Sequence, residues 1–224
     1  MANPPYACFH RGCSAAARLR GISRWARIRG GLDGASALGY GRFVWRGWGV
    51  SRYRRANVAG GSYFFTVVTE RRQPVLTDPA VRDALRAAIK SVRATRPFRI
   101  DGWVLLPDHL HTVWTLPPDD ADFPTRWRLI KAHVTRTLGD AYLRPEWLTE
   151  RRAEKRCGTL WQHRYWERLL RDEGDYRNHL DYLHLNPVKH GLVNRVVDWP
   201  WSSFHRLAAS GVYPSDWCGW GDKA

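Results

Sequence analysis

Two histidines separated by one residue are the first side chains in this sequence that could bind a metal ion. His109, Leu110 and His111 lie in a stretch of aromatic and aliphatic residues that predicts a strand. Side chains at positions i and i+2 of a strand project from one face, so both imidazoles would point to one side while Leu110 packs behind. Such a pair forms a bidentate metal site with room for substrate oxygens. The alternative is two surface histidines beside a turn, and an isolated H-x-H motif leaves both interpretations open.

A tyrosine and an asparagine four residues apart form the second candidate. Tyr182 and Asn186 would lie on one face of a helix, about one turn from each other. Tyr176 shares its face with Leu180 and is assigned to a buried stripe, and Tyr165 to a packing or stacking role in a strand. Tyr182 lies on a polar helix face with no expected role in core packing, and it is therefore the candidate functional tyrosine. The alternative is a half-exposed helix tyrosine.

The two candidates together predict phosphodiester chemistry. A phenol with a pKa of about 10 is a poor nucleophile at neutral pH. It can attack a phosphodiester when a metal ion polarises the phosphoryl oxygen. Asn186 could supply an amide oxygen as a third ligand or orient the phenol of Tyr182. The products would be a 5′-phosphotyrosine and a free 3′-hydroxyl, which can be rejoined without ATP. Imidazole, amide and phosphate ligands suit Mg²⁺ or Mn²⁺, and Zn²⁺ is expected to bind tightly and inhibit.

The charge balance favours a polyanionic partner. The formal net charge is +15, and arginine supplies 31 of the 36 cationic residues. Arginine binds phosphate with two parallel hydrogen bonds and stacks on bases, which suits a nucleic-acid surface. A GC-rich genome, whose codons favour arginine, explains the same bias, so both readings stay open.

Cations and aromatic rings alternate in three segments, as a binder of single-stranded or hairpin DNA requires. Each tryptophan in these segments could instead fill the core. The predicted DNA contacts are Arg52, Arg54, Arg55, Arg126, Lys131, Arg164 and Lys189.

The composition changes near residue 50. Residues 1–50 hold 9 of the 19 glycines and a single acidic residue, Asp33. This segment is interpreted as a disordered basic tail, or as residues upstream of a true translation start near Val50. Residues 51–224 form the predicted domain. The four cysteines fit neither a zinc nor a disulfide framework, and no apolar run could span a membrane. We therefore expect a reducing, cytoplasmic and nucleoid-associated setting.

The elements that would position these residues follow from periodicity. Residues 63–69, 99–106 and 109–116 read as strands, the last two as a hairpin, with a further strand within residues 159–170. Asp78 and Asp122 would cap two helices with apolar faces, whereas residues 144–158 read as a loop. A last helix, capped by Asp175, would run to about residue 185 and end before Pro187. The order β-α-β-β-α-β predicts a ferredoxin-like or RRM-like α+β sandwich, with helices on one face and the other face free for a ligand.

From about Arg52 to Trp220 the chain resembles the REP-associated tyrosine transposases, relatives of the single-tyrosine HUH transposases of small insertion sequences. Coverage is about three quarters of the chain, in order and at compatible spacing. The segments that carry the resemblance are RYRRANVAGGSYFFTV, WVLLPDHLHTVWTLP, FPTRWRLIK, LWQHRYWERLLRDEGDYRNHLDYLHLNPVKHGLV, DWPWSSFHR and YPSDW.

The resemblance implies an HUH endonuclease that cuts and rejoins single-stranded DNA at repetitive extragenic palindromic hairpins. The family's metal-binding pair falls on His109 and His111, its nucleophile on Tyr182 and its amide ligand on Asn186, where insertion-sequence relatives commonly carry Gln. The basic run at residues 52–55 is similar to the part that reads the hairpin foot. A monomer is favoured with a dimer as the alternative, and no nucleotide cofactor or membrane partner is expected. The competing function is a non-catalytic module that binds single-stranded DNA or RNA on the same fold.

Overall fold

Four antiparallel strands form the central sheet of the computed structural model, which describes residues 56–154 and 158–219. The predictions for residues 1–50 and for Arg52, Arg54 and Arg55 lie outside the described residues. The strands are β1 (Ser62–Val68), β2 (Arg99–Leu105), β3 (His109–Thr115) and β4 (Trp166–Leu169), in the order β2-β3-β1-β4. With a helix between β1 and β2 and another between β3 and β4, this is the predicted ferredoxin-like topology.

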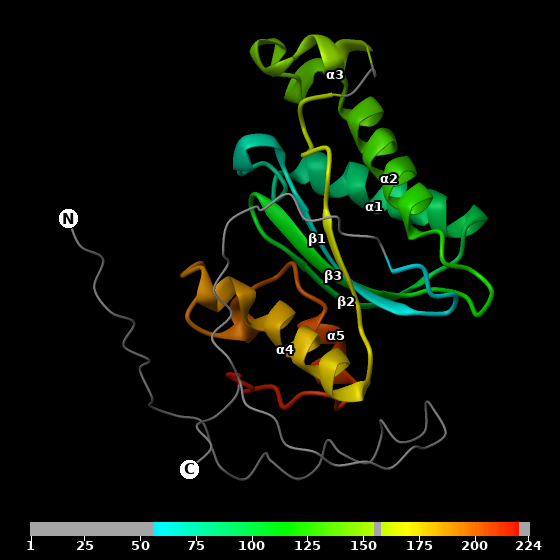
Figure 1. Ribbon diagram of the computed structural model, residues 1–224. Helices are drawn as coiled ribbons and strands as arrows, with labels where there is room; N and C mark the ends of the chain where they lie inside the picture. The colour runs from blue at the N-terminus through cyan, green and yellow to red at the C-terminus, as the bar shows by residue number, and fades with distance from the viewer. Residues whose placement is uncertain (1–55, 155–157, 220–224) are drawn as a thin grey trace, which may run out of the picture.

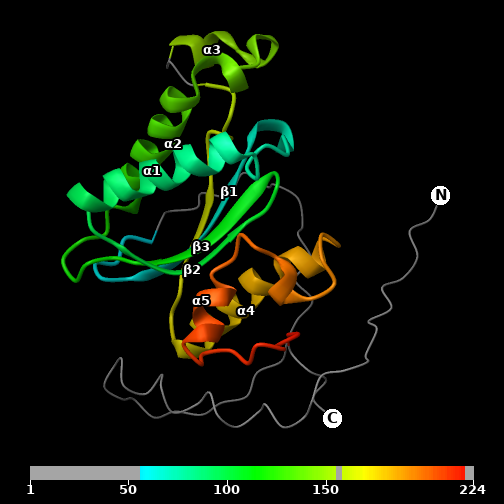
Figure 2. The same ribbon diagram turned by 180° about the vertical axis from the view of Figure 1, so that it is seen from behind.

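Helices cover both faces of the sheet. α1 (Pro79–Thr95) and α2 (Phe123–Leu138) pack on one face, and α4 (Glu173–Lys189) and α5 (Phe204–Ala209) lie on the other (Figures 1 and 2). The short α3 (Glu150–Glu154) extends beyond the end of α2 (Figure 1). Short 3₁₀ turns occupy Glu70–Arg72, Gly139–Tyr142, Pro145–Trp147 and Val196–Asp198. No helix in the described part of the chain is both long and apolar enough to cross a membrane.

The face under α1 and α2 holds the larger core, as the periodicity predicts. Tyr63, Phe65 and Val67 alternate inward from β1, and the predicted apolar stripes of both helices are buried against them. Trp114 of β3 stacks on Trp127 of α2 with ring centroids 4.2 Å apart. The Asp122 side chain caps α2 by accepting a hydrogen bond from Thr125 N. Local sequence signals therefore determine this layer.

The opposite face is partly covered by α4 rather than left open, which corrects the prediction. Phe64, Val104 and Val113 point to this side and bury Leu180 and Leu183 of α4. Gly102 of β2 permits the contact, because a Cβ atom there would lie 2.4 Å from Leu180 Cδ2. The helix that carries the proposed nucleophile is therefore packed directly on the sheet that carries the histidines.

Several predicted boundaries are wrong. The α4 helix begins at Glu173 behind the N-cap Asp172, whose side chain accepts from Asp175 N, and it continues through Pro187 to Lys189. Backbone bonds after the proline satisfy the last turn, including His190 N to Asn186 O at 2.9 Å. Residues 144–158 contain Pro145–Trp147 and α3 rather than a loop.

The segment after α4 closes one edge of the sheet. Ser203 N donates to Trp103 O at 2.8 Å, and Leu105 N donates to Trp201 O at 2.9 Å, so this segment pairs with β2. The Trp199 indole donates to Leu105 O at 2.9 Å. These bonds satisfy edge groups that would otherwise be open to another strand.

Candidate active site

The two imidazoles and the phenol lie together within one chain. His109 and His111 are 5% and 3% exposed, and their ring centroids are 4.9 Å apart. The Tyr182 ring from α4 lies 5.5 Å from the His111 ring. Phe64 supports both, with its ring 5.3 Å from His111 and 6.0 Å from Tyr182. The structure thus brings together the residues that the sequence singled out on two separate elements.

Each imidazole is oriented through its Nδ1 atom. Thr66 Oγ1, directly across from His111 in the β1–β3 register, lies 2.8 Å from His111 Nδ1. The Asp108 carboxylate accepts a hydrogen bond from His109 Nδ1 at 2.6 Å. Hydrogen bonds at both Nδ1 atoms leave the Nε2 atoms to act as ligands, the usual arrangement at metal-bound histidines. We infer that the ring orientations are set before any cation binds.

Burial and the surrounding charges favour neutral imidazole at His111, and hydrogen bonds favour an ionised carboxylate at Asp108. Burial lowers the pKa of His111 well below its ordinary value, and the nearby His109 and His190 lower it further. Burial would raise the pKa of Asp108, but hydrogen bonds from His109 and Arg72 outweigh it and hold the pKa well below its usual range. Neutral imidazole is the form that binds a metal ion.

Asn186 supplies the observation that tests the site for a metal ion. The side chain is fully buried, and its Nδ2 donates to Tyr182 O at 3.3 Å. Hydrogen bonding by the Asn186 amide raises the pKa of His111 against the effect of burial, but the contact falls outside hydrogen-bond geometry, and Asn186 Oδ1 has no partner that meets it. An unpaired buried carbonyl oxygen costs roughly 1–3 kcal/mol. A hard divalent cation held by the two imidazoles would satisfy it, so these residues fit the group that the chemistry requires.

The C-terminal end of α4 adds an ammonium group and, just after the helix, a third imidazole to the site. Lys189 Nζ lies 4.7 Å from the centre of the Tyr182 ring, and the His190 ring is 5.2 Å from that of His109. Sequence reasoning missed His190, although it continues the i, i+4 series of Tyr182 and Asn186, because the helix was expected to end before Pro187. Thr66 and Asp108 were also missed. Asp108 precedes His109 in the chain, but the partnership of Thr66 depends on the strand register.

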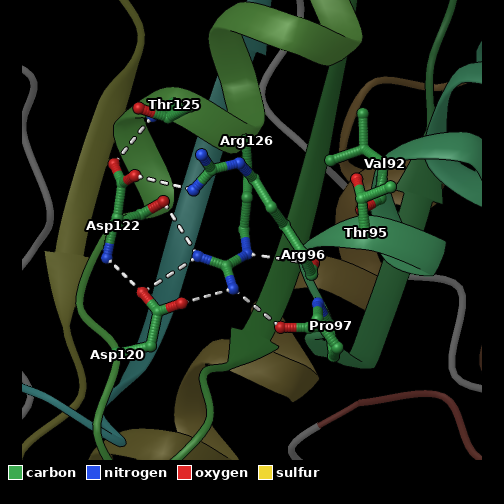
Figure 3. Close-up of polar contacts among 8 residues, drawn as sticks. All are labelled: Val92, Thr95, Arg96, Pro97, Asp120, Asp122, Thr125 and Arg126. Atoms are coloured by element: carbon green, nitrogen blue, oxygen red, sulfur yellow. Dashed lines mark hydrogen bonds and ion pairs between the residues drawn. The ribbon is translucent and has the colours of Figure 1, made fainter.

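Arg126 is not available to DNA, which corrects its predicted role. The side chain is fully buried, and its guanidinium forms a bidentate ion pair with Asp120 at 2.7 and 3.0 Å. Its remaining hydrogen bonds reach the backbone oxygens of Arg96, Pro97 and Asp122 (Figure 3). All five guanidinium N–H groups are therefore used. Arg126 ties α2 to the segment between α1 and β2 and holds no donor for a phosphate.

The other predicted DNA contacts that the structure describes are distributed around the sheet. Lys131 Nζ donates to the backbone oxygens of Gln162 and His163, so it helps to hold the segment that leads into β4. Arg164 and Lys189 are exposed. Trp166, 37% exposed, lies beside Thr66 in the β1–β4 register and so points to the same face as His111.

Comparison with known proteins places this geometry in context. Residues 57–183 match the family described as "Transposase IS200 like". The REP-associated tyrosine transposase of Escherichia coli (strain K12) is 45% identical over 171 residues, which cover 76% of this chain and 92% of that protein. A putative REP-associated tyrosine transposase of Haemophilus influenzae (strain ATCC 51907 / DSM 11121 / KW20 / Rd) is 41% identical, covering 76% and 94% of the two chains. A solved REP-associated tyrosine transposase bound to a REP hairpin superposes with a TM-score of 0.63 at 44% identity, covering 78% of this chain and 94% of that one.

Proposed function

This chain belongs to the IS200-like transposase family and is a DNA transposase, and from that premise we propose how its own residues act on a REP hairpin. Tyr182 is the nucleophile that forms a 5′-phosphotyrosine with single-stranded DNA. His109, His111 and Asn186 hold Mg²⁺ or Mn²⁺. The observation that carries the proposal is the packing of the Tyr182 phenol against His111, beside a buried amide oxygen that has no hydrogen-bond partner.

The proposed reaction is a balanced transesterification. The Tyr182 phenolic oxygen forms a bond to phosphorus, and the bond between phosphorus and the 3′-oxygen breaks. The phenol loses one proton, and the departing 3′-oxygen gains one to become a hydroxyl. Attack by another 3′-hydroxyl reverses these bonds and restores the tyrosine. When bound, the divalent cation supplies Lewis acidity to the phosphoryl oxygen. The Lys189 ammonium over the Tyr182 ring is placed to offset the negative charge that develops on the phenolic oxygen.

We propose that the hairpin and its single-stranded flank contact the exposed cations Arg164 and Lys189, with Trp166 as a stacking surface. Backbone contacts of this kind supply affinity that falls steeply with salt, while an aromatic ring stacks on any base. A substrate on genomic DNA implies a nucleoid-associated enzyme. Because one chain provides both the imidazoles and the phenol, we propose that a monomer is sufficient.

The nucleophile is tested with a labelled hairpin oligonucleotide and either cation. We expect a covalent protein–DNA adduct that survives denaturing electrophoresis. Tyr182→Phe should abolish this adduct and leave hairpin affinity nearly unchanged. Tyr176→Phe, which alters a half-buried phenol on the same helix, is the matched control and should still form the adduct.

Three outcomes would contradict parts of the proposal. An undiminished adduct in Tyr182→Phe would exclude this nucleophile. The absence of an adduct from the unaltered chain with every cation would leave only a hairpin-binding protein. If mixed Tyr182→Phe and His109→Ala chains regain cleavage that neither shows alone, the active site is shared between two copies rather than contained in a monomer.

A further inference from the structure

The turn between β1 and α1 holds two arginines in an unfavourable backbone conformation. Arg71 and Arg72 have φ values of 51° and 54°. Gln73 N donates to Glu70 O at 3.2 Å, which closes a tight turn whose two central residues both have positive φ. Asn and Gly are preferred at such positions because a larger side chain crowds the backbone there. Non-glycine residues in strained conformations persist where the surrounding structure requires them.

The side chains of these two arginines reach different partners. The Arg71 guanidinium lies 4.8 Å from the centre of the Trp147 ring. Arg72 Nη1 donates to Asp108 Oδ2 at 2.9 Å, while Asp108 Oδ1 accepts from His109 Nδ1 at 2.6 Å. Arg72, Asp108 and His109 therefore form a continuous chain of hydrogen bonds that ends at a proposed metal ligand.

The same turn also holds the backbone of Asp108. Its carbonyl oxygen accepts from Thr69 N and from Thr69 Oγ1, both at 2.9 Å. Asp108 is thus attached through its backbone to Thr69 and through its carboxylate to Arg72. A carboxylate bound at one oxygen can still rotate, whereas contacts at both oxygens define its plane.

The two imidazoles differ in how their orientation is secured. His111 pairs with Thr66 inside the sheet, where both residues belong to adjacent strands. His109 depends on Asp108, which lies in the turn before β3 and has a side chain 22% exposed. A carboxylate that accepts from Nδ1–H fixes the tautomer with Nε2 free and makes that nitrogen a stronger ligand. His109 therefore needs an external anchor that His111 does not need.

We propose that Arg72 is a positioning residue for the metal site: through Asp108 it holds His109 in the orientation and tautomer that present Nε2 to the divalent cation. This inference rests on the proposed function. The strained turn is retained because it places the guanidinium against the carboxylate.

The test measures Mn²⁺ binding to the full chain without DNA, by the electron paramagnetic resonance signal of the free ion. Asp108→Asn should weaken Mn²⁺ binding by about 10- to 100-fold, as loss of a carboxylate that orients a ligand does. Arg72→Gln should weaken it by about two- to fivefold, because the arginine side chain is 63% exposed and the ion pair is partly screened. Arg72→Lys should recover part of the affinity. Arg71→Gln is the matched control and should bind Mn²⁺ as the unaltered chain does.

A second readout needs no metal ion. In ¹⁵N NMR spectra of the metal-free protein, His109 should carry its proton on Nδ1, and Arg72→Gln and Asp108→Asn should shift population towards Nε2–H. Arg72→Gly relieves the positive φ, so it should unfold at the same or a higher temperature and still lose Mn²⁺ affinity. Cleavage by Arg72→Gln should approach that of the unaltered chain at saturating Mn²⁺, with only the half-saturating concentration raised.

The measurements distinguish failure of the proposed metal site from failure of the proposed role of Arg72. An unaltered chain that does not bind Mn²⁺ would overturn the metal site and this inference together. Mn²⁺ binding that is equal in the unaltered chain, Arg72→Gln and Arg71→Gln, with an unchanged His109 tautomer, would overturn the inference alone. Cleavage by Arg72→Gln that stays low at saturating Mn²⁺ while affinity is unchanged would assign Arg72 to DNA contact and also overturn it.

Discussion

Replacing Gly102 by alanine should displace α4, with Tyr182 and Asn186, from the two imidazoles without altering any of these residues. Gly102 lies on β2 where α4 crosses the sheet, and an added Cβ would come within 2.4 Å of Leu180 Cδ2 and 3.4 Å of Leu183 Cδ1. Both leucines are almost fully buried and have little room to rotate. The added methyl group should therefore push α4 away from the sheet, and Tyr182 with it.

The magnitude follows from the contact distance. Ordinary carbon contacts begin near 3.4 Å, so the gap of 2.4 Å at Leu180 must open by about 1 Å. Overpacking of this kind costs roughly 1–3 kcal/mol of unfolding free energy. For a chain of this size that lowers the Tm by about 2–12 °C. A displacement of about 1 Å in a reacting group can cost up to about 100-fold in rate.

The assay is the rate of covalent adduct formation at a temperature where the variant is folded, together with Mn²⁺ affinity. We expect a slower adduct rate in Gly102→Ala and a smaller change in Mn²⁺ affinity, because two of the three proposed ligands, His109 and His111, belong to β3 and only Asn186 moves with α4. The double variant Gly102→Ala with Leu180→Ala should recover part of the rate, since it removes the obstructing side chain. An adduct rate equal to that of the unaltered chain, or a double variant that is no better than the product of the two single effects, would refute this reasoning.

Two further predictions concern the framework around the site. Arg126→Met should lower the unfolding free energy by about 2–4 kcal/mol and leave hairpin affinity unchanged. The loss is smaller than for a fully buried ion pair because Asp120 is 31% exposed. Reduced hairpin affinity with unchanged stability would instead show that Arg126 contacts DNA. Burial lowers the pKa of His184 from 6.5 to about 3, so between these values only the unfolded chain binds the proton and the unfolding free energy should fall as the pH is lowered. His184→Gln, which can keep the bond to Ser203 Oγ, should flatten that dependence in urea titrations from pH 7 to pH 4; an equally steep profile would assign the acid sensitivity to other groups.

Much of the fold is encoded in short stretches of sequence. Val81, Leu85 and Val92 recur at helical spacing and are buried on α1 as expected. Asp122 precedes an apolar helix pattern and caps α2. The alternation along residues 109–116 places both histidines on one face and Leu110 on the other, because Leu110 lies in the core under α1 and α2 whereas His111 contacts Phe64 and Tyr182 on the opposite face. Such patterns depend only on the local period of the backbone, so a single sequence reveals them.

The candidate metal ligands and nucleophile could be predicted from the sequence, but the residues that orient them could not. His109, His111, Tyr182 and Asn186 could be chosen by residue type and spacing, whereas Thr66 could not. Thr66 faces His111 because of the register between β1 and β3, which joins residues 45 positions apart. Register depends on which strands pair and on how the turns close, and those are properties of the whole fold.

The arginines show most clearly that residue type alone does not predict what a side chain binds. Arg126 belongs to the cationic segments that favour a DNA partner, but its five hydrogen bonds are internal and it is fully buried. Arg72 drew no prediction from the sequence, yet it reaches the carboxylate that orients His109. A guanidinium serves a phosphate, a carboxylate or a row of backbone oxygens equally well, so its role depends on which of them the folded chain places nearby.

The sequence by itself determined the order of the four strands and the main helices and the face of the histidine pair, and it singled out Tyr182 as the candidate nucleophile, because each depends on residues close together in the chain. Only the tertiary structure decided that α4 packs over the sheet at Gly102 and continues past Pro187, so that Tyr182, Asn186 and His190 meet the imidazoles. That meeting depends on contacts between elements about 70 residues apart, and long-range packing has no local period from which it could be read.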